Sequence, residues 1–202
     1  VQVLEESAEL TFKVNTRTLV GETINGVTVR SVRMIVVNTG IGNSVVINKL
    51  VDGQISESTD FICNLRRGSY KICVVANETA TMTAALTVAN KLSDLDVIKV
   101  ITPTAETDLV LYQSIDVELR SSSSDTEQGE VSVDGGANWL SPPIVNVDLI
   151  RVASKISLAI RKRTVVEADL FTIQKVELIN LPADSYLLPG RAYGGVLHSK
   201  TP

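Results

Sequence analysis

The residue types that most often perform chemistry are sparse in this sequence. His198 is the only histidine among 202 residues, and it lies in a tail rich in Gly and Pro. A Ser–His–Asp arrangement needs a histidine held beside its nucleophile, so any such site would depend on that tail. Zinc sites need clustered Cys and His, and Cys63 and Cys73 have no companions nearby in the sequence. We therefore expect no catalytic residue, no metal, no cofactor and no enzymatic activity.

Other polar residues each have a simpler structural interpretation beside a functional one. Asp116 and Glu118 share a strand face and could form a carboxylate pair, but a solvated face accounts for them equally well. Asp125–Glu130 offers oxygen ligands for calcium, without the glycine and glutamate spacing of an EF-hand. Trp139 follows the Gly135–Gly136 turn, where it could bind a sugar or anchor the loop in the core.

The two cysteines leave their redox state open. Cys63 and Cys73 flank the Arg67–Gly68 turn, so they could form a disulfide if their strands are neighbours in register. They could equally remain thiols, because a single pair is no disulfide framework.

Composition excludes several classes of protein. The net charge is −4 and the sequence pI is about 5.1, which argues against nucleic acid as a partner. A hydrophobic fraction of 44% excludes a disordered chain, and aromatics of only 4% require a core of Val, Ile, Leu and Ala. No apolar run approaches the roughly 20 residues of a membrane span, so membrane attachment would need an anchor outside this chain.

Alternating apolar residues are the dominant pattern and predict strands. Ile115, Val117 and Leu119 alternate with acidic residues, as in a strand with one wet face. Gly- and Asn-rich turns separate the segments, which is typical of a sandwich. Further strands are expected at 9–14, 27–38, 44–47, 60–64, 69–76, 145–149, 156–160 and 171–178, with changes of phase near 150–155 and 174–175.

One segment has helical spacing instead. Val88, Leu92 and Leu95 recur as on a helix face between Thr83 and Lys99. The sequence therefore predicts a mostly β chain, a β-sandwich with one short helical segment. The expected domain covers residues 1–188, and residues 189–202 are expected to be a linker or disordered tail.

Four segments resemble the fimbrillin family of Bacteroidia-type (type V) fimbrial subunits. Asn64–Glu78 (NLRRGSYKICVVANE) is similar to that family's strand with leucine, glycine, tyrosine and alanine–asparagine–glutamate. Val29–Asn38 resembles its early strand of arginine and a hydrophobic run, and Leu149–Ile160 its strand of arginine, small residues and lysine–isoleucine. Phe171–Leu188 resembles the strand that ends in asparagine–leucine–proline and serine–tyrosine–leucine.

The resemblance implies a transthyretin-like β-sandwich, the N-terminal domain of a structural or adhesive subunit at the bacterial cell surface or outer membrane. Such subunits are exported and assemble by donor-strand addition after N-terminal processing. Their partners would be other fimbrial subunits and a host or bacterial surface receptor. The family usually has a second domain, which we expect to be absent from this stretch of chain. The apolar segments that begin at Glu9 and Val27 are the expected groove walls.

Two other functions compete with this interpretation. A stand-alone surface adhesin or carbohydrate-binding sandwich is suggested by Trp139 and by the polar segment Ser121–Glu127. A hydrolase on a β scaffold is the third, and the missing cluster of His, Cys and carboxylates argues against it.

Overall fold

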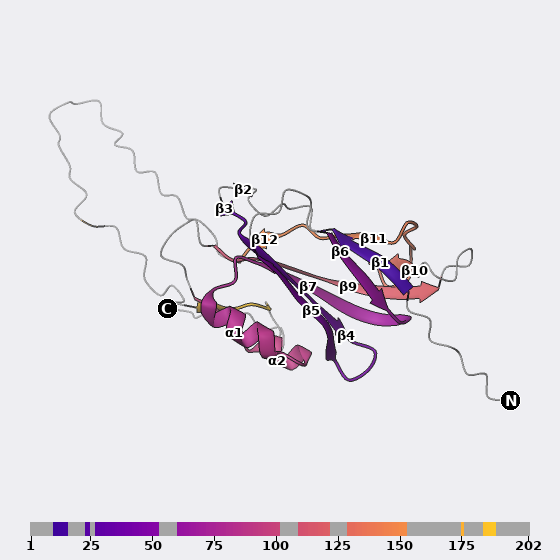
Figure 1. Ribbon diagram of the computed structural model, residues 1–202, viewed down its shortest axis with the longest axis horizontal. Helices are drawn as coiled ribbons and strands as arrows, with labels where there is room; N and C mark the ends of the chain where they lie inside the picture. The colour runs from indigo at the N-terminus through magenta and orange to yellow at the C-terminus, as the bar shows by residue number, and fades with distance from the viewer. Residues whose placement is uncertain are drawn as a thin grey trace, which may run out of the picture.

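Fifteen short elements make up the part of the chain that can be described. The computed structural model describes residues 10–15, 23–24, 27–52, 60–101, 109–121, 129–152, 175 and 184–188 (Figure 1). In chain order the elements are β1 (Leu10–Asn15), β2 (Thr23–Ile24), β3 (Val27–Thr28), β4 (Ser31–Asn38), β5 (Ser44–Asp52), β6 (Asp60–Leu65), β7 (Gly68–Ala76), α1 (Ala80–Val88), α2 (Leu92–Asp96), β8 (Lys99–Ile101), β9 (Leu111–Ser121), β10 (Gly129–Ser132), β11 (Ile144–Asn146), β12 (Ile150–Arg151) and β13 (Asp184–Tyr186).

A six-stranded antiparallel sheet organises the fold. Its order is β10–β9–β7–β4–β5, and β12 also pairs with β9. The central strand β7 pairs with β4 from Tyr70 to Ala76 and with β9 from Gly68 to Ala76. Both β4 and β7 are nearly continuous runs of buried residues, as expected of strands covered on both faces. The large sheet is therefore the middle layer of the molecule.

A second sheet of three strands, in the order β11–β1–β6, covers one face of the large sheet. Alternate residues of the two sheets meet in a shared core of mostly Val, Ile and Leu side chains. Phe61 from β6, Val145 from β11 and Ile72 from β7 are fully or almost fully buried there. The predicted β-sandwich is confirmed.

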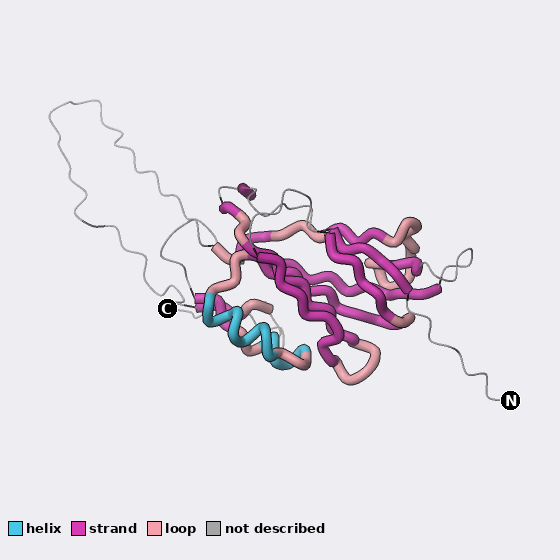
Figure 2. The backbone as a smooth tube through the Cα atoms, viewed as in Figure 1, coloured by secondary structure: helices cyan, strands magenta, loops and turns pink. Residues whose placement is uncertain are grey.

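Two short helices and the β8–β13 pair cover the opposite face of the large sheet (Figures 1 and 2). They enclose a second core in which Ile35 and Val75 of the large sheet meet Met82 and Leu86 of α1. These sheet residues alternate along the strands with those of the first core, because successive side chains point to opposite faces. The molecule thus has three layers and two cores.

The expected helical segment is present as two helices with a break between them. Ala89 is extended, with φ −63° and ψ 124°, and it ends α1. The carboxylate of Asp94 then accepts the backbone N–H groups of Asn90 and Lys91, at 2.9 and 3.0 Å, which starts α2. The predicted helix was too long at its C-terminal end, because Lys99 begins β8.

Most of the other predicted strands are confirmed, although β5 extends to Asp52, beyond the predicted residue 47. Gly68 has φ 149°, and Tyr70 is 3% exposed beside it. The Tyr70 hydroxyl donates a 2.7 Å hydrogen bond to the Arg66 carbonyl, which closes the β6–β7 turn. The strand predicted over 145–149 ends at Asn146. The strands predicted at 156–160 and 171–178 and the phase change near 174–175 lie outside the described residues, apart from residue 175.

Candidate assembly surface

Strand β1 holds the central position in the smaller sheet. It pairs antiparallel with β6 over six residues, from Leu10 opposite Leu65 to Asn15 opposite Asp60. On its other edge it pairs parallel with β11, where Val14 lies opposite Val145. Both partners are distant in sequence, so β1 is held by strands that do not adjoin it in the chain (Figure 1).

The residues opposite β1 form one wall of the inter-sheet core. Phe61, Cys63 and Leu65 of β6 are 1%, 0% and 8% exposed. They alternate with Ile62, which is 70% exposed on the outer face. An extended segment in the β1 position therefore completes two ladders of hydrogen bonds and lies beside a row of buried apolar side chains. The segment beginning at Glu9, which the resemblance implied as a groove wall, supplies β1, and β1 lies between β6 and β11.

The two cysteines lie in different cores. Cys63 belongs to the inter-sheet core, whereas Cys73 belongs to the core beneath the helices. Both are free thiols in the structure. The Tyr70, Ile72 and Val74 side chains of β7 face the first core, and Cys73 has the opposite parity. Burial raises the pKa of the Cys63 thiol to about 11, which keeps it protonated and unreactive.

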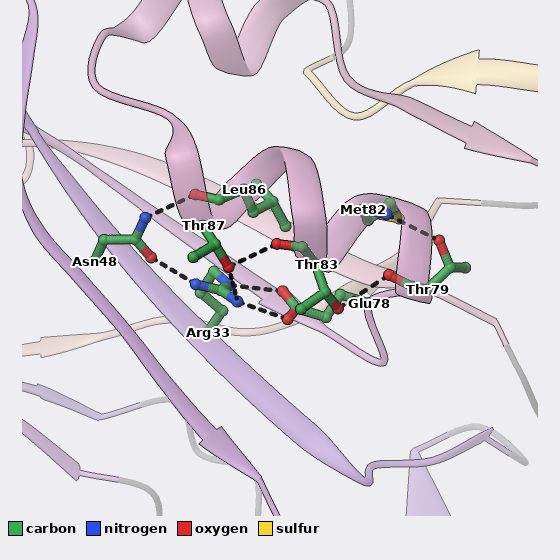
Figure 3. Close-up of polar contacts among 8 residues, drawn as sticks. All are labelled: Arg33, Asn48, Glu78, Thr79, Met82, Thr83, Leu86 and Thr87. Carbon is green, nitrogen blue, oxygen red and sulfur yellow. Dashed lines mark hydrogen bonds and ion pairs between the residues drawn. The ribbon is translucent and has the colours of Figure 1, made fainter.

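A buried ionic cluster joins α1 to the large sheet (Figure 3). The guanidinium of Arg33 donates two hydrogen bonds to the two carboxylate oxygens of Glu78, at 2.7 and 2.8 Å. It also donates to Asn48 Oδ1 at 2.7 Å and to Thr87 Oγ1 at 3.3 Å. Asn48 Nδ2 in turn donates to the Leu86 carbonyl at 2.7 Å. The Arg33 and Glu78 side chains are only 4% and 3% exposed, so this cluster is a structural clamp.

Sequence reasoning treated Arg33 only as part of a family-like strand and missed the clamp. A signal was present, because an arginine inside a run of buried apolar residues must find a partner. The identity of that partner was not readable, since Glu78 lies 45 positions further along the chain.

The acidic pair on β9 is divided between two environments. Asp116 is 76% exposed and forms an ion pair with Lys71 on the neighbouring strand. Glu118 lies beside the turn, where its carboxylate would be 3.0 Å from a Cβ atom added at Gly136. Within the described residues, no group of three or more His, Cys, Asp or Glu side chains is arranged to hold a metal ion.

Trp139 packs on a side chain of the sheet and is partly exposed. The guanidinium of Arg120 lies 3.9 Å from the centre of its ring, and Arg120 also pairs with Glu130 at 2.7 Å. One face of the indole is therefore occupied by a cation. The loop was expected to be anchored in the core. It is anchored to the sheet surface instead, since Trp139 belongs to neither buried core.

The turn before Trp139 is held by its own side chains. Asp134 accepts hydrogen bonds from the Ser132 hydroxyl at 2.7 Å and from the Asn138 backbone and amide at 2.9 and 2.6 Å. These bonds lower the pKa of Asp134 to about 2, with the Ser132 bond as the largest cause. The two glycines have φ of 70° and 84°, which closes the turn.

Several candidate residues lie outside the described part of the chain. These are His198, most of the acidic segment 125–130 and of the polar segment 121–127, and residues 153–155 of the phase change near 150–155. In the described residues, no helix is both long and apolar enough to cross a membrane.

Comparison with known proteins gives structural neighbours only. The sequence matches no protein-family model, and no curated protein matches it. The tip fimbrial protein Mfa3 from Porphyromonas gingivalis, truncated at its C-terminus, is 17% identical with a TM-score of 0.41; the match covers 72% of this chain and 48% of that one.

Two further solved structures are similar to the same degree. A candidate cell adhesion protein from Parabacteroides distasonis ATCC 8503 is 16% identical with a TM-score of 0.43, over 71% of this chain and 39% of that one. Another from Bacteroides eggerthii DSM 20697 is 16% identical with a TM-score of 0.40, over 72% and 40%. The chain thus spans less than half the length of each, and TM-scores below 0.5 carry no functional conclusion.

Proposed function

We propose that this chain is a structural or adhesive subunit of a bacterial surface fimbria, which assembles by donor-strand addition at the β1 position after N-terminal processing. Residues 1–188 would form its sandwich domain and residues 189–202 the linker that follows. Its partners would be other fimbrial subunits and a surface receptor, and it would work at the outer surface of the cell.

The observation that carries the proposal is the place of β1 between β6 and β11. Removal of a central strand would leave backbone N–H and C=O groups on both neighbours without partners. It would also uncover the buried row that includes Phe61 and Leu65. An incoming strand with apolar residues at alternate positions would satisfy both needs at once.

Burial of apolar side chains would contribute to the stability of such a joint. Each Val, Leu, Ile or Phe side chain that an incoming strand buries contributes about 1.5–3 kcal/mol before the cost of association. The sequence at the β1 position, LTFKVN, offers three such residues at alternate positions. A strand of this pattern from a second molecule could therefore replace it.

A strand-exchange experiment tests the proposal on the folded protein. A specific protease site is introduced within residues 16–22, after β1, and the chain is cut there. The circular dichroism spectrum must show that the cut protein keeps its native secondary structure. A labelled peptide of residues 8–17 is then added. We expect the peptide to exchange into the cut protein.

The matched control is the same peptide with Phe12→Asp and Val14→Asp, which keeps its length but not its apolar pattern. This control should not exchange. A cut protein that takes up neither peptide, or takes up both equally, would contradict donor-strand addition.

A further inference from the structure

An apolar groove runs along α1 on the helical side of the molecule. It has a volume of about 560 Å³ and lies between α1 and the segment that leads into β8. Met82 and Ile98 are buried at its base, whereas Val88 and Val97 are 70% and 67% exposed beside it. Exposed apolar side chains around a hollow mark a surface that another segment can cover.

The chain leaves the described structure next to this groove. Strand β13 runs antiparallel to β8, with Tyr186 opposite Lys99. The register continues beyond the strand, because the Leu187 N–H donates to the Ile98 carbonyl at 2.8 Å. The next position of that register sets Leu188 opposite Val97, one of the residues that line the groove.

An unsatisfied polar atom belongs to the residue that precedes Val97, which lines the groove. The Oδ1 atom of Asp96 is buried and has no hydrogen-bond partner among the described residues. Asp96 ends α2 directly before Val97. A buried carboxylate oxygen costs free energy unless it accepts a hydrogen bond. A donor from the segment after Leu188 would satisfy Asp96 Oδ1.

The residues that follow Leu188 fit both requirements. Arg191 comes three positions later and carries five N–H donors on a cationic group. Tyr193, Val196 and Leu197 come next and are the large apolar residues of the segment 189–202, which contains no acidic residue. Four residues span up to about 13 Å when extended, and Val97 lines the same groove as α1.

We infer that the segment 191–197 of this chain docks in the α1 groove, with Arg191 bound to Asp96 and with Tyr193, Val196 and Leu197 against the apolar lining. The docked segment covers Val88 and Val97 and fixes the direction in which the chain leaves the sandwich. This inference does not depend on donor-strand addition, which concerns the opposite side of the large sheet.

Cysteine cross-linking in the full chain tests the docking. Val88→Cys and Val196→Cys are introduced together, and disulfide formation is followed by mass under mild oxidation. The control is Ile41→Cys with Val196→Cys, because Ile41 is 76% exposed and its turn contacts α2 through the bond from Leu92 N to Asn43 O at 2.9 Å. A docked segment should react with position 88 on the order of tenfold faster than with position 41, through its higher effective concentration.

The charge contact is tested in the same background. Arg191→Ala should slow cross-linking at position 88, whereas Lys200→Ala, in the same segment, should leave the rate unchanged. Equal rates for positions 88 and 41 would overturn the docking, and equal rates for the two charge variants would overturn the role of Asp96. Cross-linked dimers whose yield rises with protein concentration would show that the groove takes a second copy, which also overturns the inference.

Discussion

At the scale of single residues, the two cysteines report on two separate interiors. Cys63 lies between the sheets, and Cys73 lies beneath the helices on the other side of the large sheet. Each is at most 1% exposed, so neither should react with an alkylating reagent in the native protein. Their different locations make them independent probes of the two faces.

We predict that removal of β1 from the cut protein will expose Cys63 to alkylation and leave Cys73 protected. The physical reason is that Cys63 lies opposite Phe12 in the β1–β6 ladder, whereas Cys73 faces the helices. Peptide mapping after treatment with iodoacetamide measures both sites in one sample. Alkylation of both cysteines would mean that the whole domain had opened, and a native protein in which either reacts rapidly would contradict the burial.

We also predict that the turn at Asp134 opens only in strong acid. Its pKa is lowered to about 2, so the contribution of the carboxylate is present above the unfolded value of about 3.9 and is lost as the pH falls through 2. The Asn138 amide resonance, followed by NMR, should keep its folded position to about pH 3. Asp134→Asn, which has no carboxylate to titrate, should remove this change of the Asn138 resonance with pH. If the change persists in the variant, another group causes it.

At the scale of elements, the clamp between Arg33 and Glu78 explains how α1 finds its place on the sheet. Apolar packing beneath the helix could be satisfied by several small shifts along its axis. The hydrogen bonds from Arg33 to Glu78 and Thr87, before and within α1, together with the bond from Asn48 to the Leu86 carbonyl, fit a single position. A buried polar network of this kind specifies geometry more than it adds stability.

We predict that Glu78→Gln will destabilise the protein by about 3–5 kcal/mol, because it leaves the Arg33 charge buried without a counter-charge. Denaturant unfolding measures the loss. Glu130→Gln is the control: it breaks an ion pair whose guanidinium, on Arg120, is 51% exposed, and it should cost about 0–1 kcal/mol. Similar losses for the two variants would contradict the importance of burial at the clamp.

Local pattern was enough to predict the longer strands but not the short ones or the partners of any strand. The runs in β4 and β7 are apolar at nearly every position, which correctly indicated buried strands. Alternation along β7 also predicted that Cys73 points to the opposite face from Ile72 and Val74. It did not predict which layer covers that face. Pairing between β1 and β11 depends on segments far apart in the chain, and no local signal encodes it. The clamp was hidden for the same reason, since the partners of Arg33 come from β5, α1 and the loop before α1.

At the scale of the whole molecule, one sheet is shared by two cores. Strand β7 is paired along its length with β4 and β9 and is covered on both faces. The smaller sheet has only one of its faces in a core. The most stable part of the molecule should therefore be the centre of the large sheet.

We predict that amide hydrogen exchange will be slowest in β7 and β4, and faster in β6 and β11 by a margin that grows when β1 is removed. Mass spectrometry of the intact and cut proteins measures both states. Exchange that rises equally in β6 and β7 after removal of β1 would show a single cooperative unit and would contradict the separate roles of the two sheets.

The two strands that flank β1 are synthesised at different times. Of the described strands β1 is made first and β6 follows it, but residues 144–146 of β11 come much later. At 5–20 residues per second, several seconds pass between the completion of β6 and the arrival of β11. Throughout that interval the nascent chain carries β1 as an open edge, so the strand made earliest is among the last to be enclosed.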